Sequence, residues 1–315
     1  MANTPAIYGG QAVIEGVMFA GKSVHVTAVR RKDSSIAFLE VPKPEKQRFL
    51  WLRKIPFIRG MIGLIDAAAN GSKHLQFSME QFAEDEGEDV EAMKKEAEKD
   101  SFWAKFGFTV TIGVAGIISL FFSKALFTAV PAAIEQFLFS SLFANQALHA
   151  LIEGIIKILI LLTYMYLISL TPPIKRLFQY HGAEHKVISC FENNEELTVA
   201  NVQKYSTLHY RCGSSFMVFT VLVGVIIYSA YNLIDPYTGF WDRIFQRLYL
   251  LPIVVGVSYE VLRWTNAMRE IPVLRYLGYP GLWLQKLTTR EPNDEHVEVA
   301  IASFNRMREI DAKGN

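Results

Sequence analysis

The chain has 315 residues, of which 51% are apolar, and its mean hydropathy is +0.19. These values are too apolar for an ordinary soluble domain and too polar for a wholly embedded one, so we expect a membrane part with water-soluble flanks. The formal net charge of +1 gives no reason to expect nucleic acid as a partner, and two cysteines, Cys190 and Cys212, do not support a disulfide framework.

Residues 1–83 are expected to form a small cytoplasmic region of strands followed by a helix. The N-terminus lacks the basic start and apolar core of a signal peptide, so we expect it to stay in the cytoplasm. Residues 7–41 predict short β-strands, because β-branched runs alternate with glycine-rich and polar turns. Residues 46–81 predict an amphipathic helix, interrupted at Pro56, whose basic residues suit either a membrane surface or a solvated face. The acidic run at 84–101 predicts a solvated linker.

Four apolar runs within residues 102–268 predict transmembrane helices. They lie near 106–123, 154–174, 212–234 and 245–264. The clearest run is uncharged over 23 residues, which is about 34 Å as a helix and enough to cross the hydrocarbon core. Buried helices of a soluble domain could imitate one such run but hardly all four. The expected fold class is therefore a polytopic α-helical membrane protein with about four transmembrane helices and a small α+β N-terminal region.

Basic residues flank these runs unevenly, which predicts an orientation. The loop at 175–211 and its borders carry Lys175, Arg176, Lys186, Lys204 and Arg211. The loop between the first two runs has almost no basic residue beyond Lys124. The positive-inside rule then places the 175–211 loop and both termini in the cytoplasm, and an even number of spans agrees with this.

The tail, residues 269–315, is expected to be interfacial and cytoplasmic. Tyr276, Tyr279 and Trp283 suit the level of the lipid headgroups, in a helix pair broken by prolines. The segment at 288–307 then predicts a turn and an amphipathic helix.

The segment after the second apolar run places His181, Glu184 and His185 within five residues. On a helix, two imidazoles four residues apart share a face, and H-x-x-E-H is the order of the inverted zincins. In such sites the imidazoles bind zinc and the carboxylate activates the bound water. Gly182 is a poor residue inside a helix, so the sequence leaves helical geometry open, and a five-residue pattern also arises by chance.

A second pair, His209 and Cys212, precedes the next apolar run and has the spacing of a zinc-ligand pair. The spans that enter and leave this loop end at the same surface, so the two clusters should meet. Four protein ligands would make a structural site, whereas three ligands and a water would make a catalytic one. Histidine with cysteine favours zinc over magnesium or calcium. The alternative is that His209 is an interface anchor and Cys212 a small buried side chain.

Three further polar residues are candidate accessories to this site. Glu260 lies inside the fourth apolar run, where a carboxylate is a functional hypothesis by default. It could face the cluster as a ligand or base, or form an ion pair with Arg263 or Lys157. Gln11 and Glu15 lie among glycines near the N-terminus and could line a site or belong to turns.

Four motifs in order, GGQAVIEGVM, YHGAEHK, RCGSSF and TTREP, resemble the YqhQ-like family. This bacterial family has no known function and is often labelled a predicted metal-dependent enzyme. The resemblance implies a multi-span inner-membrane protein with a metal site. The residues that it carries over are His181, Glu184, His185, Arg211 and Cys212, with Gln11, Glu15 and Glu291 as lesser candidates. The family pattern has a proline where this chain has Tyr210, a departure that affects turn geometry.

The leading hypothesis from the sequence is a metal-dependent hydrolase at the cytoplasmic face of the inner membrane. It would act on a lipid-linked or membrane-protein substrate, with Glu184 as general base and zinc as cofactor. The alternative is a non-enzymatic membrane protein, such as a scaffold, a quality-control factor or an insertion or extraction factor, whose His/Cys site is structural. A transporter is a third hypothesis, for which few polar residues lie inside the spans. The expected partners are the lipid bilayer and other membrane proteins.

Overall fold

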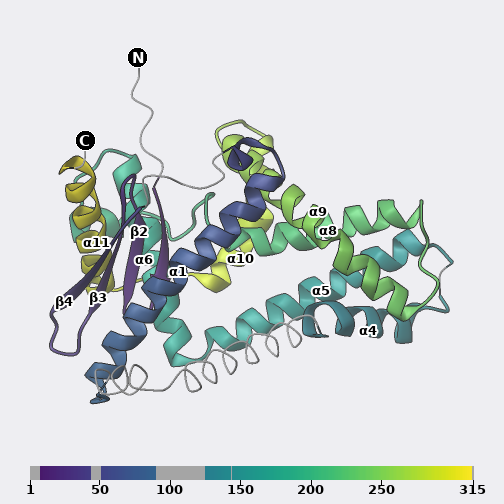
Figure 1. Cartoon of the computed structure of the whole chain (residues 1–315), viewed down its shortest axis with the longest axis horizontal. Coiled ribbons are helices and arrows are strands. Elements are labelled where there is room, and N and C mark those ends of the chain that lie inside the picture. Colours follow the sequence, from purple (N-terminus) through teal and green to yellow (C-terminus); the bar gives the residue numbers. More distant parts are fainter. Residues whose placement is uncertain (1–7, 44–50, 90–124, 143, 314–315) are drawn as a thin grey trace, which may run out of the picture.

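The computed structural model describes residues 8–43, 51–89, 125–142 and 144–313, which fold into two connected parts (Figure 1). A small antiparallel sheet with helices on both faces forms one end. A bundle of long apolar helices extends from it, and α10 (Tyr279–Thr288) lies where the two parts meet. The first predicted span and the predicted acidic linker from residue 90 onward lie outside the described residues.

The sheet has the strand order β1-β2-β3-β4, and all neighbouring strands are antiparallel. The strands are β1 (Gly9–Val13), β2 (Gly16–Ala20), β3 (Val24–Arg30) and β4 (Ile36–Pro42). They coincide with the predicted strand region, 7–41, except that β4 extends one residue beyond it. In the first hairpin Val13 pairs with Gly16, so a two-residue turn joins the strands and Glu15 adopts a φ of 53°. A Cβ at Gly16 would lie 2.1 Å from the Ala28 oxygen, so glycine is required there.

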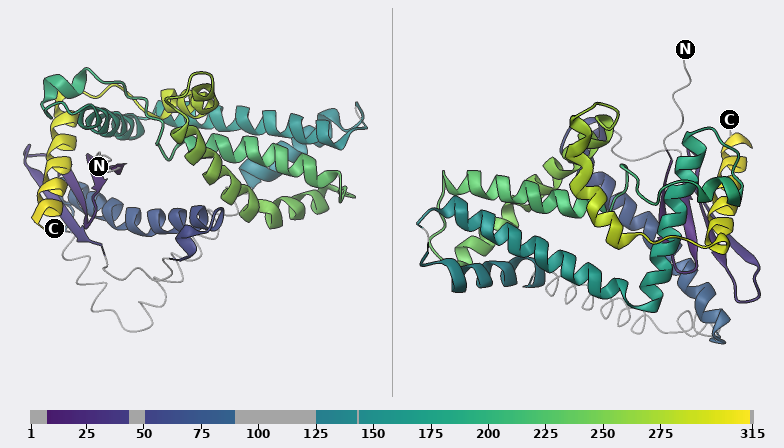
Figure 2. Two further views of the ribbon diagram at one scale, coloured as in Figure 1. Left: turned by 90° about the horizontal axis from the view of Figure 1, so that it is seen from above. Right: turned by 180° about the vertical axis from the view of Figure 1, so that it is seen from behind.

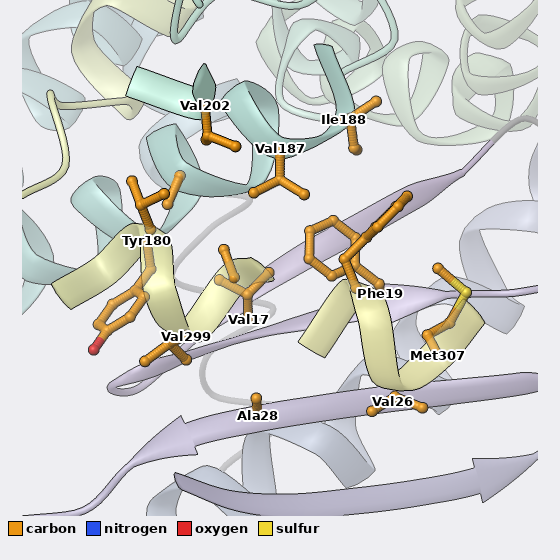
Figure 3. Close-up of a cluster of buried hydrophobic side chains, with 14 of the residues drawn as sticks. Val17, Phe19, Val26, Ala28, Tyr180, Val187, Ile188, Val202, Val299 and Met307 are labelled. Atoms are coloured by element: carbon orange, nitrogen blue, oxygen red, sulfur yellow. The ribbon is translucent and has the colours of Figure 1, made fainter. Parts of the chain in front are cut away.

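One face of the sheet is covered by α6 (Pro172–Glu192) and α11 (Asp294–Lys313), and these elements enclose the main hydrophobic core (Figure 3). Alternate residues of each strand point to this face. Fully or almost fully buried side chains from the sheet, α6 and α11 meet there, among them Val17, Phe19, Val26, Tyr180, Val187, Val299 and Met307. The core therefore fixes α6, the helix that carries the first histidine cluster, directly on the sheet.

The other face of the sheet is covered by α1 (Ile58–Asp85), and this contact is made by small and polar side chains. The buried residues of α1 include Gly71, His74 and Ser78. His74 Nδ1 lies 2.6 Å from Thr27 Oγ1 of β3. This hydrogen bond satisfies one ring nitrogen of the buried histidine, whereas Nε2 has no hydrogen-bond partner among the described residues.

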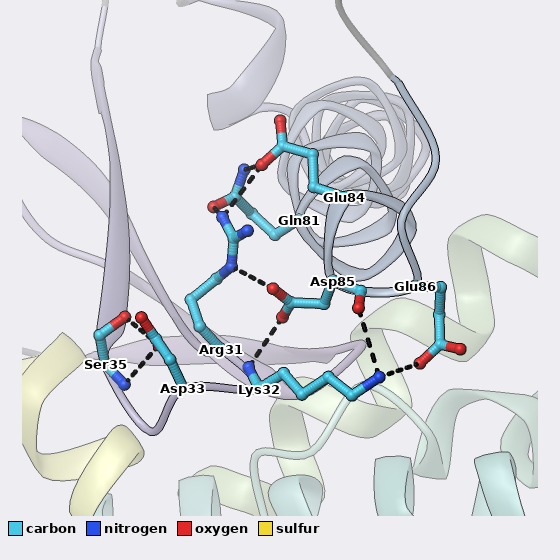
Figure 4. A network of polar contacts seen from close by, with 8 residues as sticks. All are labelled: Arg31, Lys32, Asp33, Ser35, Gln81, Glu84, Asp85 and Glu86. Carbon is cyan, nitrogen blue, oxygen red and sulfur yellow. Dashed lines mark hydrogen bonds and ion pairs between the residues drawn. The ribbon is translucent and has the colours of Figure 1, made fainter.

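Different features define the start of α1 and anchor its C-terminal end. At its start, a single 3-10 turn, η1 (Leu52–Lys54), precedes Pro56, so the helix predicted over 46–81 begins only beyond the proline. At its other end, charged groups tie it to the turn between β3 and β4 (Figure 4). Arg31 Nε donates to Asp85 at 2.9 Å, and the Lys32 backbone N–H donates to the same carboxylate at 2.9 Å.

Three helices among the described residues are long and apolar enough to cross a membrane. They are Ala147–Ser169 within α5 (Gln146–Ser169), Ser215–Asn232 as α8, and Phe240–Ala267 as α9. A shorter apolar helix over Leu126–Phe139 combines η2 (Ala125–Ala129) and α4 (Val130–Phe139). Three of the four predicted runs overlap these long helices, with shifted ends. The run predicted to reach residue 174 stops at Ser169, because Pro172 and Pro173 begin a new helix, α6.

The end of the bundle remote from the sheet holds a buried ion-pair network. Arg243 is 2% exposed and lies 2.5 Å from carboxylate oxygens of both Glu135 and Glu153. Arg247 Nε donates to Glu153 at 2.6 Å, and the His149 ring contacts Glu135. Both arginines lie inside α9, which begins five residues before the fourth predicted run, 245–264. Both are paired, because an unpaired charge in an apolar bundle is costly.

Most of the predicted loop between the second and third predicted spans, 175–211, is helical. After α5 the chain turns at Thr171 and continues as α6, which leaves the bundle for the sheet (Figures 1 and 2). A short helix, α7 (Val199–Gln203), follows, and residues 204–214 return to the start of α8. After α9, a 3-10 turn, η3 (Leu274–Gly278), leads into α10. The topology therefore returns the chain twice to the junction between the two parts.

Candidate metal centre

A cavity of about 350 Å³ lies between β1, α6 and the turn that precedes α8. The lining comes from segments far apart in sequence: Tyr8–Ala12, Leu177, Phe178, His181, Glu184, His185, Ile188, His209 and Arg211–Ser214. Three of the four motifs that carried the family resemblance contribute to it. The fourth, TTREP, packs against α6 at Gly182, and its Thr288 oxygen accepts a hydrogen bond from His181 Nδ1.

The first cluster is on a regular helix, and Gly182 has a packing role in it. A Cβ at this position would lie 2.2 Å from the Arg290 backbone oxygen and 3.2 Å from Thr207 Cγ2. The glycine therefore lets the 288–290 segment lie against α6. Because the helix is continuous, His181 and His185 share one face, and their ring centroids are 4.5 Å apart.

Both imidazoles are held in the same tautomer by backbone oxygens. His181 Nδ1 lies 2.8 Å from the Thr288 oxygen, and His185 Nδ1 lies 2.5 Å from the Thr207 oxygen. A carbonyl oxygen can only accept, so each Nδ1 carries the proton and each Nε2 presents a lone pair. Burial lowers the pKa of His185, and this favours the neutral form that a metal requires.

Cys212 completes a three-residue group. The ligand atoms of His181, His185 and Cys212 all lie within 4.8 Å of one another. His181 Nε2 is 3.2 Å from Cys212 Sγ, and Ser214 Oγ is 3.0 Å from the same sulfur. Two imidazole lone pairs and a thiol that converge in this way form a donor set that zinc prefers.

Glu184 lies beside this group in a dry environment. Burial raises its pKa, and the nearby His181 and His209 rings and the Gly10 backbone N–H, which donates to the carboxylate, only partly oppose that shift. A Cβ at Gly10 would lie 3.0 Å from Glu184 Cγ and Cδ, so β1 approaches the carboxylate closely. A carboxyl group whose pKa is raised by burial is a stronger base than an ordinary carboxylate, so it is suited to proton transfer.

His209 lies next to the group without belonging to it. Its ring centroid is 5.7 Å from that of His185, and burial lowers its pKa to about 4. Its Nε2 lies 3.7 Å from a carboxylate oxygen of Glu192, which also forms an ion pair with Arg211. His209 and Arg211 therefore stand at the wall of the cavity, with Glu192 as a shared partner that the sequence did not indicate.

The accessory candidates lie at different distances from the centre. Gln11 lines the cavity, and a Cβ on Gly71 of α1 would lie 2.3 Å from Gln11 Oε1, so Gln11 also packs against α1. Glu15 binds Arg176 on α6, outside the cavity lining. Glu291 lies 2.8 Å from Lys186 Nζ at the surface.

The structure places Glu260 away from the cluster. Arg59 of α1 binds its carboxylate through two nitrogens, with Nε 2.7 Å from Oε1, and the Phe57 backbone N–H donates to the same oxygen at 3.1 Å. A Cβ at Gly60 would lie 2.5 Å from Tyr259, so α1 and α9 are in close contact there. The carboxylate inside α9 therefore joins α1 to the bundle.

Sequence reasoning missed Gln285, which is completely buried on α10. Its Oε1 accepts from the His209 backbone N–H at 2.8 Å, and its Nε2 donates to the His209 oxygen at 2.8 Å and to Ser215 Oγ at 2.9 Å. In the sequence, the only indication of its role is that a glutamine stands among the mostly apolar residues of YPGLWLQKLT.

These observations define a mostly helical protein that has, among the described residues, three helices able to cross a membrane, a small antiparallel sheet and a largely buried His–His–Cys cluster beside a carboxylate. The chain belongs to the family described as "Protein of unknown function (DUF1385)", whose model matches residues 55–310. It is 49% identical over 308 residues to the uncharacterized protein YqhQ of Bacillus subtilis (strain 168), covering 98% of this chain and 94% of that one. The resemblance to the YqhQ-like family is thus confirmed. No solved structure matches the chain.

Proposed function

We propose that this protein is an integral inner-membrane, metal-dependent hydrolase whose zinc would be held by His181, His185 and Cys212. One observation supports this most directly. Both histidines donate Nδ1–H to backbone oxygens, so both Nε2 lone pairs are fixed and available beside the Cys212 sulfur. In metal sites the second ring nitrogen of a histidine ligand is characteristically held in this way.

The number of ligands favours a catalytic site over a structural one. Structural zinc sites use four protein ligands, whereas catalytic sites use three and keep one position open. Within the described residues the group has three members, and they adjoin the cavity. Zinc bound there would supply Lewis-acid activation of water and of a substrate carbonyl or phosphoryl oxygen.

Glu184 is the proposed general base. Its carboxylate lines the same cavity, and burial raises its pKa, which makes it a stronger base than an ordinary carboxylate. The Gly10 N–H donates to the carboxylate, so the group has a defined orientation. The residues of the chain thus bind the metal, accept a proton at Glu184 and enclose the reacting groups between β1 and α6.

The proposed substrate is associated with the membrane, because the cavity lies at the junction of the helical bundle and the sheet. Cys212 lies only three residues before the start of α8, a helix that is long and apolar enough to span a bilayer. The excess of basic residues around 175–211 supports a cytoplasmic location for this junction.

A structural, non-enzymatic site is the second candidate, and one observation favours it. The cluster joins α6 to the turn before α8, so a metal there would also hold the two parts of the molecule together. Transport through the cluster is not proposed, because Glu260 is bound by Arg59 and lies away from the cavity lining.

Metal content, measured by mass spectrometry on chelator-free, detergent-purified protein, tests the ligand set. We expect about one zinc per chain in the wild type and in Glu184→Gln, and a loss of zinc in His181→Ala and Cys212→Ala. Cys190→Ala is the matched control, since Cys190 is also buried but lies outside the cluster. A wild-type protein without stoichiometric metal would refute the proposal.

Cobalt substitution separates the catalytic reading from the structural one. A Co²⁺–thiolate charge-transfer absorption that is absent in Cys212→Ser would identify the cysteine ligand. Acetohydroxamate should change the visible spectrum of the cobalt protein if one coordination position is open. An unchanged spectrum at saturating acetohydroxamate would favour a closed, structural site.

A further inference from the structure

The segment that follows α9, Met268–Thr288, exposes an unusual number of large apolar and aromatic side chains. The exposed fractions are 47% for Ile271, 73% for Val273, 51% for Tyr276, 55% for Leu277 and 62% for Trp283. The same segment contains three basic residues, Arg269, Arg275 and Lys286, against one acidic residue, Glu270. An exposed surface that is both apolar and basic has the chemistry of a contact with anionic lipid headgroups.

The position of the segment agrees with such a contact. It leaves the last turn of α9 at the junction of the bundle and the sheet (Figures 1 and 2). Trp241 and Trp264, which are 72% and 60% exposed, mark the two ends of α9. They are separated by about 34 Å of helix, close to the thickness of a hydrocarbon core, and tryptophan is enriched at both membrane interfaces. Trp264 and the segment beside it therefore fall at one headgroup level.

The opposite side of this segment packs on the turn that carries His209 and Cys212. A Cβ at Gly278 would lie 2.7 Å from the Tyr210 ring, and one at Gly281 would lie 2.6 Å from Ser215. These glycines let α10 approach the turn closely. Gln285 then forms hydrogen bonds with both backbone groups of His209, as a neighbouring strand would.

The last turn of α10 also reaches the first cluster. The Thr288 oxygen accepts from His181 Nδ1, so one short helix supports a proposed ligand on α6 and the turn before α8. Hydrogen-bond partners of metal ligands set the orientation and the basicity of those ligands.

We infer that Met268–Thr288 is a contact surface for anionic lipid headgroups, and that Gln285 is the positioning residue through which this membrane-seated segment holds the metal centre. The coupling rests on the proposed function, whereas the lipid contact does not. A bilayer surface that fixes the outer side of α10 also fixes its inner side, because the helix is only ten residues long and is packed between the two.

Fluorescence quenching by brominated lipid tests the contact surface. The full-length protein is placed in nanodiscs of phosphatidylcholine with or without phosphatidylglycerol, and the emission lost on changing Trp283 to Phe is assigned to Trp283. We expect brominated lipid to quench this component, more strongly with anionic lipid. We also expect Arg275→Gln to weaken the effect of lipid charge. A component that is equally bright in brominated and ordinary lipid would show that the surface faces water or another protein, and would overturn the inference.

Zinc affinity, measured by competition with a fluorescent chelator in the same nanodiscs, tests Gln285. Gln285→Met keeps the size of the side chain and removes its hydrogen bonds, and we expect zinc to bind roughly 10- to 100-fold more weakly. Gln285→Glu retains an acceptor for the His209 N–H and should recover part of the affinity. Gln246→Met is the matched control, because Gln246 is also buried but lies at the remote end of the bundle, where it donates to the Asp235 oxygen.

The outcomes distinguish a failure of this inference from a failure of the proposed function. Wild-type affinity in Gln285→Met would refute the positioning role while leaving the metal site intact. If the wild type binds no zinc, the proposed function fails, and positioning is measured by alkylation of Cys212 in a Cys190→Ala background. Gln285→Met should then expose Cys212, which is 8% exposed in the structure, and accelerate its alkylation. An unchanged rate would refute the role.

Discussion

Replacing Gly182 with alanine should destabilise the protein, although alanine is the better helix former. Gly182 lies in the middle of α6 between the two histidines. The new Cβ would lie 2.2 Å from the Arg290 oxygen, which is roughly 1 Å short of van der Waals contact. The obstacle is backbone, so it cannot rotate away. Relief requires the 288–290 segment to move, and the Thr288 oxygen that holds His181 would move with it.

The two opposing effects have different sizes. Alanine should gain about 1 kcal/mol over glycine in a helix interior. Overpacking at a tight contact typically costs about 1–3 kcal/mol, and this contact lies at the severe end of the scale. We therefore expect a net loss of about 1–2 kcal/mol in the free energy of unfolding. We also expect weaker zinc binding, because the His181 tautomer loses its support.

Equilibrium unfolding in detergent, followed by far-UV circular dichroism, measures the first effect, and chelator competition measures the second. Gly63→Ala is the matched control, since Gly63 is also inside a helix but its Cβ would meet Tyr259 only at 3.9 Å. This control should be neutral or more stable by up to about 1 kcal/mol. A Gly182→Ala protein as stable as the Gly63→Ala protein, with wild-type zinc affinity, would refute the packing argument.

Two further predictions concern regions outside the centre. Acidification from neutral pH toward pH 4 should lower the free energy of unfolding, because burial, followed by the charges of Lys43 and His74, lowers the pKa of His25 to about 4 while the unfolded chain takes up a proton near 6.5. His25→Gln should flatten this dependence in a pH series of unfolding curves, and an unchanged slope would contradict it. Arg59→Met should destabilise the contact of α1 with α9, and adding Glu260→Met should restore part of the loss, because the single change leaves a buried carboxylate unpaired. Zinc content should be the same in both variants, and a loss of zinc would show that Glu260 acts at the centre.

The sequence could indicate the cluster because its signals are local. His181 and His185 are four residues apart, and His209 and Cys212 are three apart, so spacing alone suggests paired ligands. The apolar runs on either side then place both pairs at one end of the bundle. Spacing alone could not show which of these four residues form the ligand group. The structure groups three of them and leaves His209 in the cavity lining, where Gln285, 76 residues further along the chain, binds its backbone.

Long-range pairing explains the other differences between the sequence analysis and the structure. Glu260 is 201 residues from Arg59, and Arg243 is 108 residues from Glu135. A carboxylate or guanidinium within an apolar run shows that a partner must exist, since an unpaired charge there is costly. It does not show which of many candidates that partner is. Similarly, Gly182 argues against a helix by propensity, and only the Arg290 backbone beside it explains why the helix keeps a glycine.

The N-terminal motif shows how such a long-range contact gives meaning to a short sequence. GGQAVIEGVM contains no phosphate-binding pattern, and its polar residues suggested either a site or a turn. In the structure Gly10 places a backbone N–H against Glu184, while any Cβ there would lie 2.6 Å from the Met18 oxygen and 3.0 Å from the carboxylate side chain. Gly10 can therefore approach Glu184 this closely only because it has no side chain. Since Glu184 is the proposed base and the Gly10 N–H favours its charged form, the edge of the sheet belongs to the chemistry of the site as well as to its wall.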